Sequence, residues 1–295
     1  MIRPIGAEVG VLSRLGAAFK LFDESALRLA TGLQINRGAD DPGGLIAAEN
    51  LRSEVAALEA ASRNTDRAVS VARTADTGLA QVGELLRRVE VNLLTSAGGG
   101  LSDAETEALQ IENDAALEAI NRIGATTGFN GTKLLSGSGG TDGSAEADGE
   151  LVLRFAISPD PGDTVSLSLP TVNTARLGND EGALNELASG GTADLRSGDS
   201  ARAARILRGA RDQVLSARAR LGSFERNTLD TNRSVLSGIL QSTTRGLSNL
   251  VDADFAAETS RLLRSELLVR SSIAAVNTIG RRQSLLAELL RPRES

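Results

Sequence analysis

The sequence contains no histidine and no cysteine. Histidine is the commonest general base and metal ligand, and cysteine supplies the thiol nucleophile. Their joint absence excludes zinc hydrolysis, cysteine proteolysis and the Ser-His-Asp triad in their usual forms. Chemistry based on carboxylates, lysine or Mg²⁺ is not excluded. Without cysteine there are no disulfides, so the sequence does not indicate a redox compartment.

Aromatic residues are scarce, at 2% of the chain, with six Phe and neither Tyr nor Trp. Aromatic rings normally supply much of the area buried in a compact core. Here Ala, Leu, Val and Ile must fill the core, and small residues favour thin, closely packed helix pairs. The composition therefore predicts an elongated protein.

Charge is balanced and interspersed: 32 Lys and Arg stand against 38 Asp and Glu, for a net charge of −6. No basic block is present to follow a phosphate backbone, so we expect no nucleic-acid partner. No stretch approaches the roughly 20 apolar residues of a membrane span, so no membrane insertion is expected. The first residues lack the apolar core of a signal peptide, which argues against export by the general secretory route.

The N-terminal segment carries a heptad pattern that predicts a helix. Its apolar positions alternate at spacings of three and four: Leu12, Leu15, Phe19, Phe22, Ala26, Leu29 and Leu33. The pattern breaks at Gly32 and at the turn-rich segment 37–44. An isolated helix of this kind is marginal in water, so we expect this seam to need a packing partner.

A second heptad stripe runs without proline and predicts a helix from about Gly44 to Ser96, roughly 80 Å long. Its members are Leu58, Ala61, Thr65, Ala68, Ala72, Ala75, Leu79, Val82, Leu86, Val89 and Leu93. The run ends at Gly98-Gly-Gly100. Ser102 and Glu105 then have capping-box spacing, which predicts a third helix that stops before Gly128.

The middle of the chain has a different pattern. Residues 136–149 are rich in Gly, Ser, Asp and Thr and predict a loop. Two β-prone runs, 151–157 and 164–169, flank a Pro-Asp-Pro-Gly-Asp turn and predict a β-hairpin near 150–170. Residues 171–199 are loosely patterned, and we expect a loop there.

Helical periodicity returns from about Ser200 and continues to the C-terminus. The first stripe contains Ile206, Ala210, Val214, Ala217, Leu221, Phe224, Thr228, Thr231 and Val235, and a last helix after Asp254 carries Leu262, Val269, Ile273, Val276, Leu285, Leu286, Leu289 and Leu290. We therefore predict a mainly α fold, in which N- and C-terminal segments form a long antiparallel helical bundle or coiled coil, with a small β-hairpin in mid-chain.

Two features could suggest chemistry, and each has a simpler structural explanation. Asp40 and Asp41 are adjacent and do not share a helix face, so capping of the next helix is favoured over a metal or acid–base pair. Asp252 and Asp254 precede the last helix in the same way. Gly98-Gly-Gly100 lacks the Gly-Lys-Ser/Thr of a phosphate loop. We predict no catalytic residue, no cofactor and no metal site.

Several segments, in order along the chain, resemble bacterial flagellin. They are Arg28-Leu-Ala-Thr-Gly-Leu-Gln-Ile-Asn36, Ala39-Asp-Asp41, Ile46-Ala-Ala-Glu-Asn-Leu-Arg52, Ala61-Ser-Arg-Asn64, Thr127-Gly-Phe-Asn-Gly-Thr-Lys-Leu-Leu135, Arg220-Leu-Gly-Ser223, Asp252-Ala-Asp-Phe-Ala-Ala-Glu258 and Leu289-Leu-Arg291. Together they extend over about two thirds of the chain.

The resemblance implies a domain plan and a set of partners. Residues 1–40 and 256–295 would form an inner-tube domain of terminal helices, and 41–255 an outer helical domain with the hairpin. The implied partners are the protein itself, as a helical homopolymer, and a flagellar export chaperone, cap and hook-junction proteins. Export would use the flagellar secretion channel. Some family members engage a host innate receptor through an Arg-rich patch, but Glu90 stands where an Arg aligns, so that recognition is not carried over.

The function predicted is a structural subunit that polymerises into the extracellular bacterial flagellar filament for motility, and not an enzyme. Alternatives are a hook–filament junction protein of the same family, a non-flagellar coiled-coil interaction module and an enzyme carried on a flagellar scaffold. The predicted self-assembly seams are Leu12, Leu15, Phe19, Phe22, Leu29, Leu33, Leu262, Val269, Ile273, Val276, Leu289 and Leu290.

Overall fold

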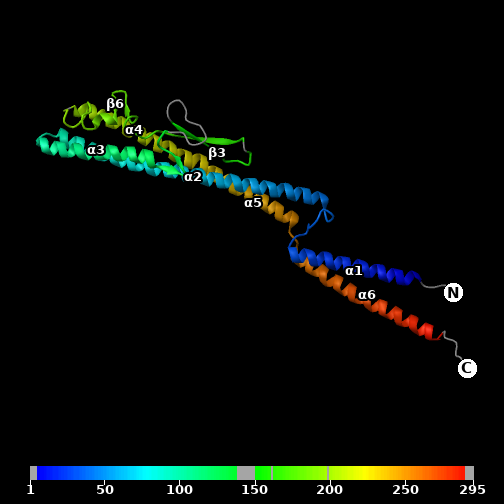
Figure 1. Cartoon of the computed structure of the whole chain (residues 1–295). Helices are drawn as coiled ribbons and strands as arrows, with labels where there is room; N and C mark the ends of the chain where they lie inside the picture. Colours follow the sequence, from blue (N-terminus) through cyan, green and yellow to red (C-terminus); the bar gives the residue numbers. More distant parts are fainter. Residues whose placement is uncertain (1–4, 138–149, 161, 198, 290–295) are drawn as a thin grey trace. The chain divides into compact units, whose positions relative to one another are not determined.

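The computed structural model describes residues 5–137, 150–160, 162–197 and 199–289, with side chains described between residues 9 and 282. Helices dominate: α1 (Ile5–Thr31), α2 (Pro42–Ala97), α3 (Asp103–Thr126), α4 (Ser200–Phe224), α5 (Thr231–Val251) and α6 (Phe255–Leu289) (Figure 1). Three short antiparallel strand pairs complete the fold: β1–β2 (Gly128–Phe129, Thr132–Lys133), β3–β4 (Leu151–Ala156, Thr164–Leu169) and β5–β6 (Gly178–Asn179, Gly182–Ala183).

The mainly α fold class predicted from the sequence is confirmed. The chain divides into two compact units: residues 1–55 with 241–295 form unit 1, and residues 56–240 form unit 2. Among the described residues, no helix is long and apolar enough to cross a membrane. The predicted loop at 136–149 lies mostly outside the residues that the structure describes.

The long stripe on α2 provides the spine of unit 2. Every predicted member of it, from Leu58 to Leu93, is buried. Its second half belongs to one continuous apolar cluster with residues of α3, α4 and the β3–β4 hairpin. The 3,4 spacing therefore predicted both the helix and the face that it buries.

Ion pairs flank this apolar seam where α4 runs antiparallel to α2. Arg218 contacts Asp76 and Arg211 contacts Glu90, each at 2.8 Å. Both pairs are partly exposed and contribute little stability. Each pair joins two residues that face each other when α2 and α4 run in opposite directions, so the two pairs together favour one antiparallel alignment.

The capping box predicted before α3 is present. Glu105 N–H donates to the Ser102 hydroxyl, and Ser102 N–H donates to the Glu105 carboxylate at 2.7 Å. These backbone and hydroxyl donors hold the pKa of Glu105 below its usual value. The third helix therefore begins where its sequence signal predicts.

The predicted hairpin is also present, as β3 and β4 paired from Leu151 with Leu169 to Ala156 with Thr164. Alternate residues point to opposite faces of a strand. Leu151 and Leu167 are buried in the main cluster, whereas Arg154 and Ser166 are exposed. The hairpin thus covers the core of unit 2 with one face.

The prediction of a plain loop for residues 171–199 was wrong. This segment contains the β5–β6 pair and a 3₁₀ turn, η1 (Leu184–Leu187), whose Leu184 and Leu187 are buried in the main cluster. Two-residue strands are too short to show a periodicity, which is why the sequence pattern missed them. At Gly209 of α4 a Cβ would lie 2.8 Å from the Gly178 carbonyl oxygen, so glycine there permits close packing of the segment.

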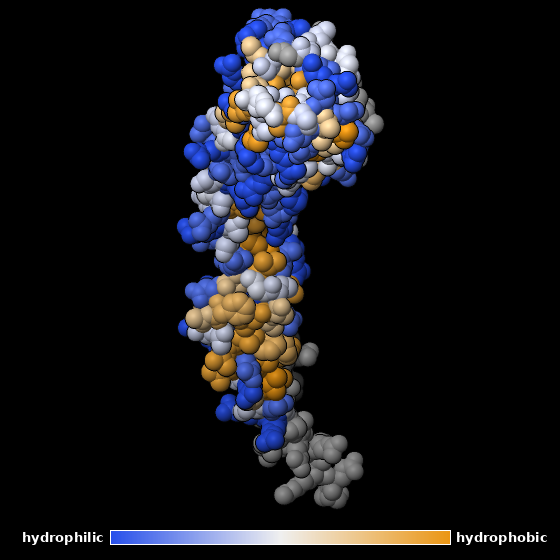
Figure 2. All heavy atoms as spheres, turned by 90° about the vertical axis from the view of Figure 1, so that its left-hand side faces the viewer, coloured by the Kyte–Doolittle hydropathy of each residue, from blue (hydrophilic) through white to orange (hydrophobic). Residues whose placement is uncertain are grey.

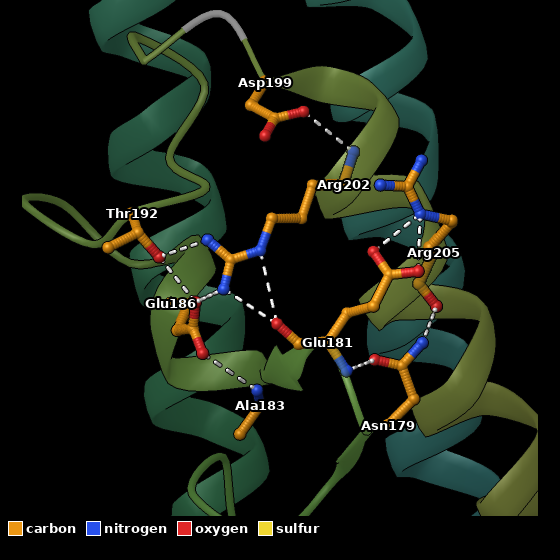
Figure 3. A network of polar contacts seen from close by, with 8 residues as sticks. All are labelled: Asn179, Glu181, Ala183, Glu186, Thr192, Asp199, Arg202 and Arg205. Carbon is orange, nitrogen blue, oxygen red and sulfur yellow. Dashed lines mark hydrogen bonds and ion pairs between the residues drawn. The ribbon is translucent and has the colours of Figure 1, made fainter.

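Polar contacts attach the same segment to the N-terminal end of α4 (Figure 3). Arg202 donates to the Glu181 carbonyl oxygen at 2.7 Å, to the Thr192 hydroxyl and to the Glu186 carboxylate. Donation from Thr192, from the Ala183 N–H and from Arg202 keeps the pKa of Glu186 below its usual value. Arg205 contacts the Glu181 carboxylate at 2.7 Å. These polar contacts hold the segment against α4, although its sequence has no apolar periodicity.

The stripe predicted beyond α4 was wrong in its last two members. Positions Ile206 to Leu221 are buried as expected, but Thr231 and Val235 are exposed, and Leu229 and Leu236 are buried instead. A π-helical turn, η2 (Glu225–Asp230), lies between α4 and α5. Such a turn takes one extra residue, so the buried face moves forward by one position.

Leu79→Ala should destabilise unit 2 by about 2–5 kcal/mol, because it removes a fully buried side chain from a closely packed seam. Urea unfolding followed by circular dichroism measures the change. Leu94→Ala is the matched control on the same helix: Leu94 is 64% exposed, and its loss should change stability by about 0.5 kcal/mol or less. Equal losses for the two variants would contradict the assignment of the buried face.

Candidate assembly surface

The two terminal helices, α1 and α6, pack against each other in unit 1. They are antiparallel, because α1 begins and α6 ends at the same end of the pair (Figure 1). This pairing of the first helix with the last is the arrangement that the sequence predicted.

The contact line between these helices is small and polar. Among the side chains described on α1 and α6, the fully buried ones are Ala18, Ser25, Glu258 and Ser265. Short side chains let two helices approach closely, but they bury little apolar area. The pair is therefore joined without a large apolar core of its own.

A buried carboxylate lies near the base of this line. Glu258 is 3% exposed, and its Oε1 accepts hydrogen bonds from Arg28 of α1 at 3.1 Å and from Arg261 at 2.6 Å. Burial raises the pKa of this carboxyl, but donation by Arg28, Ser25 and Arg261 outweighs it, so the pKa lies below its usual value. The carboxylate therefore stays charged and bridges the two helices.

Backbone contacts close the base of the pair. The Gln34 N–H donates to the Val251 carbonyl at 2.7 Å, and the Ala253 N–H donates to the Gly32 carbonyl at 2.8 Å. Gly32 ends α1 with a φ of +72°, a left-handed conformation that favours glycine. This junction fixes the ends of α1 and α5 to each other.

The aspartates before α2 and α6 act as helix caps. Asp41 accepts from the Gly44 N–H at 2.9 Å, and Asp254 accepts from the N–H groups of Ala256 and Ala257. Asp40 has a different local role, because it accepts from the backbone N–H groups of Asn36 and Arg37. These contacts agree with the structural explanation of the Asp40-Asp41 pair.

The predicted seam residues that the structure describes differ in their burial. Leu12, Phe19 and Ile273 are exposed, whereas Leu15, Phe22, Leu29, Leu33, Leu262, Val269 and Val276 are half-buried. Leu289 ends α6, but its side chain lies beyond those described, and Leu290 lies outside the described residues. Their part in self-assembly stays a prediction.

Further apolar side chains on the same helices are exposed, and the heptad analysis did not select them. They are Val9, Leu21 and Leu27 on α1, and Phe255, Leu263, Leu267 and Leu268 on α6. The adjacent leucines at 262–263 and 267–268 were the available signal, because neighbouring residues on a helix cannot share a face. Two leucines in succession therefore indicate apolar surface on more than one side of α6.

In Figure 2, apolar surface drawn in orange gathers on the part of the molecule that carries the terminal helices. A hollow of about 280 Å³ lies between the helices, lined by Val11, Leu12, Val276, Ile279 and Gly280. Exposed apolar surface of this extent on a water-facing helix pair marks an interaction site. The α1–α6 surface is therefore the candidate functional site.

The described residues offer no alternative site of metal chemistry. No group of three or more carboxylates among them is placed to hold a metal ion. Glu258 is engaged in ion pairs, and Asp254 is engaged as a helix cap. The α1–α6 pair is suited to bind other apolar surfaces through its exposed apolar side chains.

Comparison with known proteins identifies the class. The model of the bacterial flagellin N-terminal helical region matches residues 11–139, and that of the C-terminal helical region matches residues 205–290. The two matches cover both long-helix segments of the chain. This is a structural protein and not an enzyme. The chain belongs to the bacterial flagellin family.

Relatives of similar and of greater length are found. Flagellin of Bacillus subtilis is 28% identical over 97% of this chain and 98% of its own length. B-type flagellin of Pseudomonas aeruginosa is 33% identical over 59% of this chain, a match that spans 33% of its own length. The chain thus has the compact size of the first relative and covers about a third of the second.

A solved structure supports the fold. The putative flagellar hook-associated protein from Vibrio parahaemolyticus superposes with a TM-score of 0.58, at 16% identity, over 72% of this chain and 100% of that one. At this identity the likeness concerns the fold alone.

Glu258→Gln should lower the unfolding free energy of the α1–α6 pair by about 2 kcal/mol near neutral pH, because the charged hydrogen bonds from Arg28 and Arg261 are lost. A carboxyl with a depressed pKa stabilises above the usual Glu pKa and loses this contribution as pH falls through its folded value. The free energy of unfolding of the variant should therefore depend less on pH than that of the native protein at pH values below the usual Glu pKa.

Urea unfolding at a series of pH values measures both effects. Glu24→Gln is the control, because Glu24 is partly exposed on α1 and its contact with Lys20, at 3.8 Å, is weak. If the two variants have the same pH profile, Glu258 is not the bridging charge.

Proposed function

We propose that this chain is the structural subunit that polymerises into the extracellular bacterial flagellar filament. The observation that carries the proposal is the apolar surface that α1 and α6 leave uncovered when paired only with each other. Family membership supports it, and so does the full-length match to a flagellin of nearly the same size.

Assembly supplies what the pair lacks. Exposed leucines such as Leu12 and Leu267 become buried when neighbouring copies place their own terminal helices beside them. Each contact uses different surfaces on the two partners, and a contact of this kind that does not close generates a filament and not a ring. Much of the burial that stabilises unit 1 is then intermolecular.

The seam residues belong to this proposal. In it, residues 1–40 and 256–295 form the inner tube, and residues 41–255 form the outer domain that carries the hairpin. The half-buried members, such as Leu15 and Val269, complete the contact inside one chain. The exposed members, such as Phe19 and Ile273, contact neighbouring copies.

Further partners follow from the family. An export chaperone would cover the apolar terminal surface before assembly, and cap and hook-junction proteins would contact the two ends of the polymer. Export would proceed through the flagellar secretion channel.

Leu12→Gln and Leu267→Gln should each raise the critical concentration for polymerisation about tenfold. The reason is that each variant forfeits part of the roughly 1.5–3 kcal/mol gained on burying a leucine, and 1.4 kcal/mol corresponds to a factor of ten. Sedimentation of filaments after seeding measures the concentration of free subunit. Lys20→Gln is the control, because this side chain is 78% exposed and its ion pair is weak.

Unchanged critical concentrations in both leucine variants would refute the assignment of the surface. Immunogold labelling is expected along the whole filament. Labelling confined to the base of the filament would instead identify a junction protein of the same family.

A further inference from the structure

One edge of strand β3 lies along a hollow in unit 2. The hollow has a volume of about 570 Å³, and all six residues of β3, Leu151–Ala156, line it. Side chains of a strand alternate between its two faces, so a hollow over one face would be lined mainly by every second residue. The six successive residues therefore indicate that the hollow follows the edge of the strand, where its backbone is exposed.

The backbone groups on this edge have no strand partner. Among the described strands, β3 pairs only with β4, and β4 lies next to α4. Outside that ladder, residues 151–156 make no backbone–backbone hydrogen bond within the described part of the chain. Every second residue of an edge strand directs its N–H and C=O away from the ladder. The edge therefore presents a row of donors and acceptors, about 20 Å long, that a further strand would satisfy.

The rest of the hollow is suited to hold a polypeptide. Its lining includes Val71 of α2 and Leu134, which are buried in the main cluster. Asn64 of α2, with Asn130 and Thr132 of the β1–β2 turn, contributes amide and hydroxyl groups to the same lining. Ligand sites commonly combine an apolar base with a few polar groups in this way.

The charged side chains that line the hollow are all positive. Arg67 of α2 and Arg154 of β3 belong to the lining, and no acidic residue does. Both arginines are exposed, and neither forms an ion pair with a described residue. Arg211 and Arg218 of α4, in contrast, are paired with carboxylates of α2. Because a guanidinium binds a carboxylate through parallel N–H donors, the hollow favours an acidic occupant.

We propose that the edge of β3 is a docking site for an extended, acidic segment of a partner protein, which adds a third strand to the β3–β4 hairpin. Main-chain hydrogen bonds to the strand edge supply affinity, and carboxylates beside Arg67 and Arg154 supply specificity. The whole site lies within unit 2 of one chain. It therefore does not depend on the proposed filament function.

A synthetic peptide tests the site on the soluble chain. The probe is a labelled hexapeptide in which Glu alternates with Val, because valine favours an extended chain and alternate glutamates share one face. This Glu peptide should bind saturably, with a micromolar dissociation constant. The same peptide with Lys in place of Glu should bind more weakly by about tenfold or more, because like charges repel. Fluorescence anisotropy measures both dissociation constants.

Charge reversal on the protein locates the binding site. Arg67→Glu and Arg154→Glu should each raise the dissociation constant of the Glu peptide about tenfold, because repulsion replaces a charge-assisted hydrogen bond. Both side chains are exposed, so the fold should persist. Arg208→Glu is the matched control, because Arg208 is exposed on α4 and does not line the hollow. It should leave the dissociation constant unchanged.

A methylated peptide tests whether the backbone pairs. Methylation of the backbone nitrogens of the Glu peptide keeps every carboxylate but removes the N–H donors that a strand needs. The methylated peptide should bind more weakly by about tenfold or more, since each lost backbone bond contributes to affinity. In hydrogen exchange followed by mass spectrometry, the unmethylated Glu peptide should slow exchange in residues 151–156 of β3 and not in residues 164–169 of β4.

Three results would each overturn the proposal. The first is that the Glu peptide does not bind saturably to the native chain. The second is that its methylated form binds as tightly, or that exchange in residues 151–156 does not slow, because the backbone edge is then not used. The third is that Arg208→Glu weakens binding as much as Arg67→Glu and Arg154→Glu, because attraction is then not confined to the hollow.

Discussion

Burial by small side chains is the constraint on which this structure depends. With almost no aromatic residues, apolar area must come from long stripes on closely spaced helices. On α2 the stripe from Leu58 to Leu93 is covered completely by other parts of unit 2. The β3–β4 hairpin and the 171–199 segment exist in this setting as covers for a thin helix layer.

The terminal helix pair also packs through small side chains, but here the large apolar residues are exposed or half-buried instead of buried. Helices α1 and α6 have only each other within the described part of unit 1, and their contact line is occupied by Ala18, two serines and Glu258. The buried Glu258 carboxylate contributes more to the alignment of the two helices than to the stability of the pair. Many of the apolar side chains described on this pair are exposed at its surface.

The sequence predicted the helices well where one face is fully buried, as in the α2 stripe and the Ser102 capping box. It could not predict features that depend on partners. Leu263 and Leu267 are exposed within the chain, and the single heptad seam did not select them. The π-turn was missed since Thr228 and Val235 continue the heptad formally, and only packing against α2 selects Leu229 and Leu236. The 171–199 segment is held by Arg202 and Glu186, and polar networks leave no pattern in the sequence.

The Arg28–Glu258 contact has a geometric consequence. It joins two antiparallel rods at one point near their common base, at 3.1 Å between Arg28 Nη1 and Glu258 Oε1. Sliding either rod by one helical turn, about 5.4 Å, would break this contact and leave the buried Glu258 paired only with Arg261 of its own helix. The contact therefore fixes the axial alignment of α1 against α6. Each exposed leucine then has a defined position along the axis of the pair. Every copy of the chain then presents its exposed leucines at the same axial positions, and a repeating lattice requires this uniformity of its subunits.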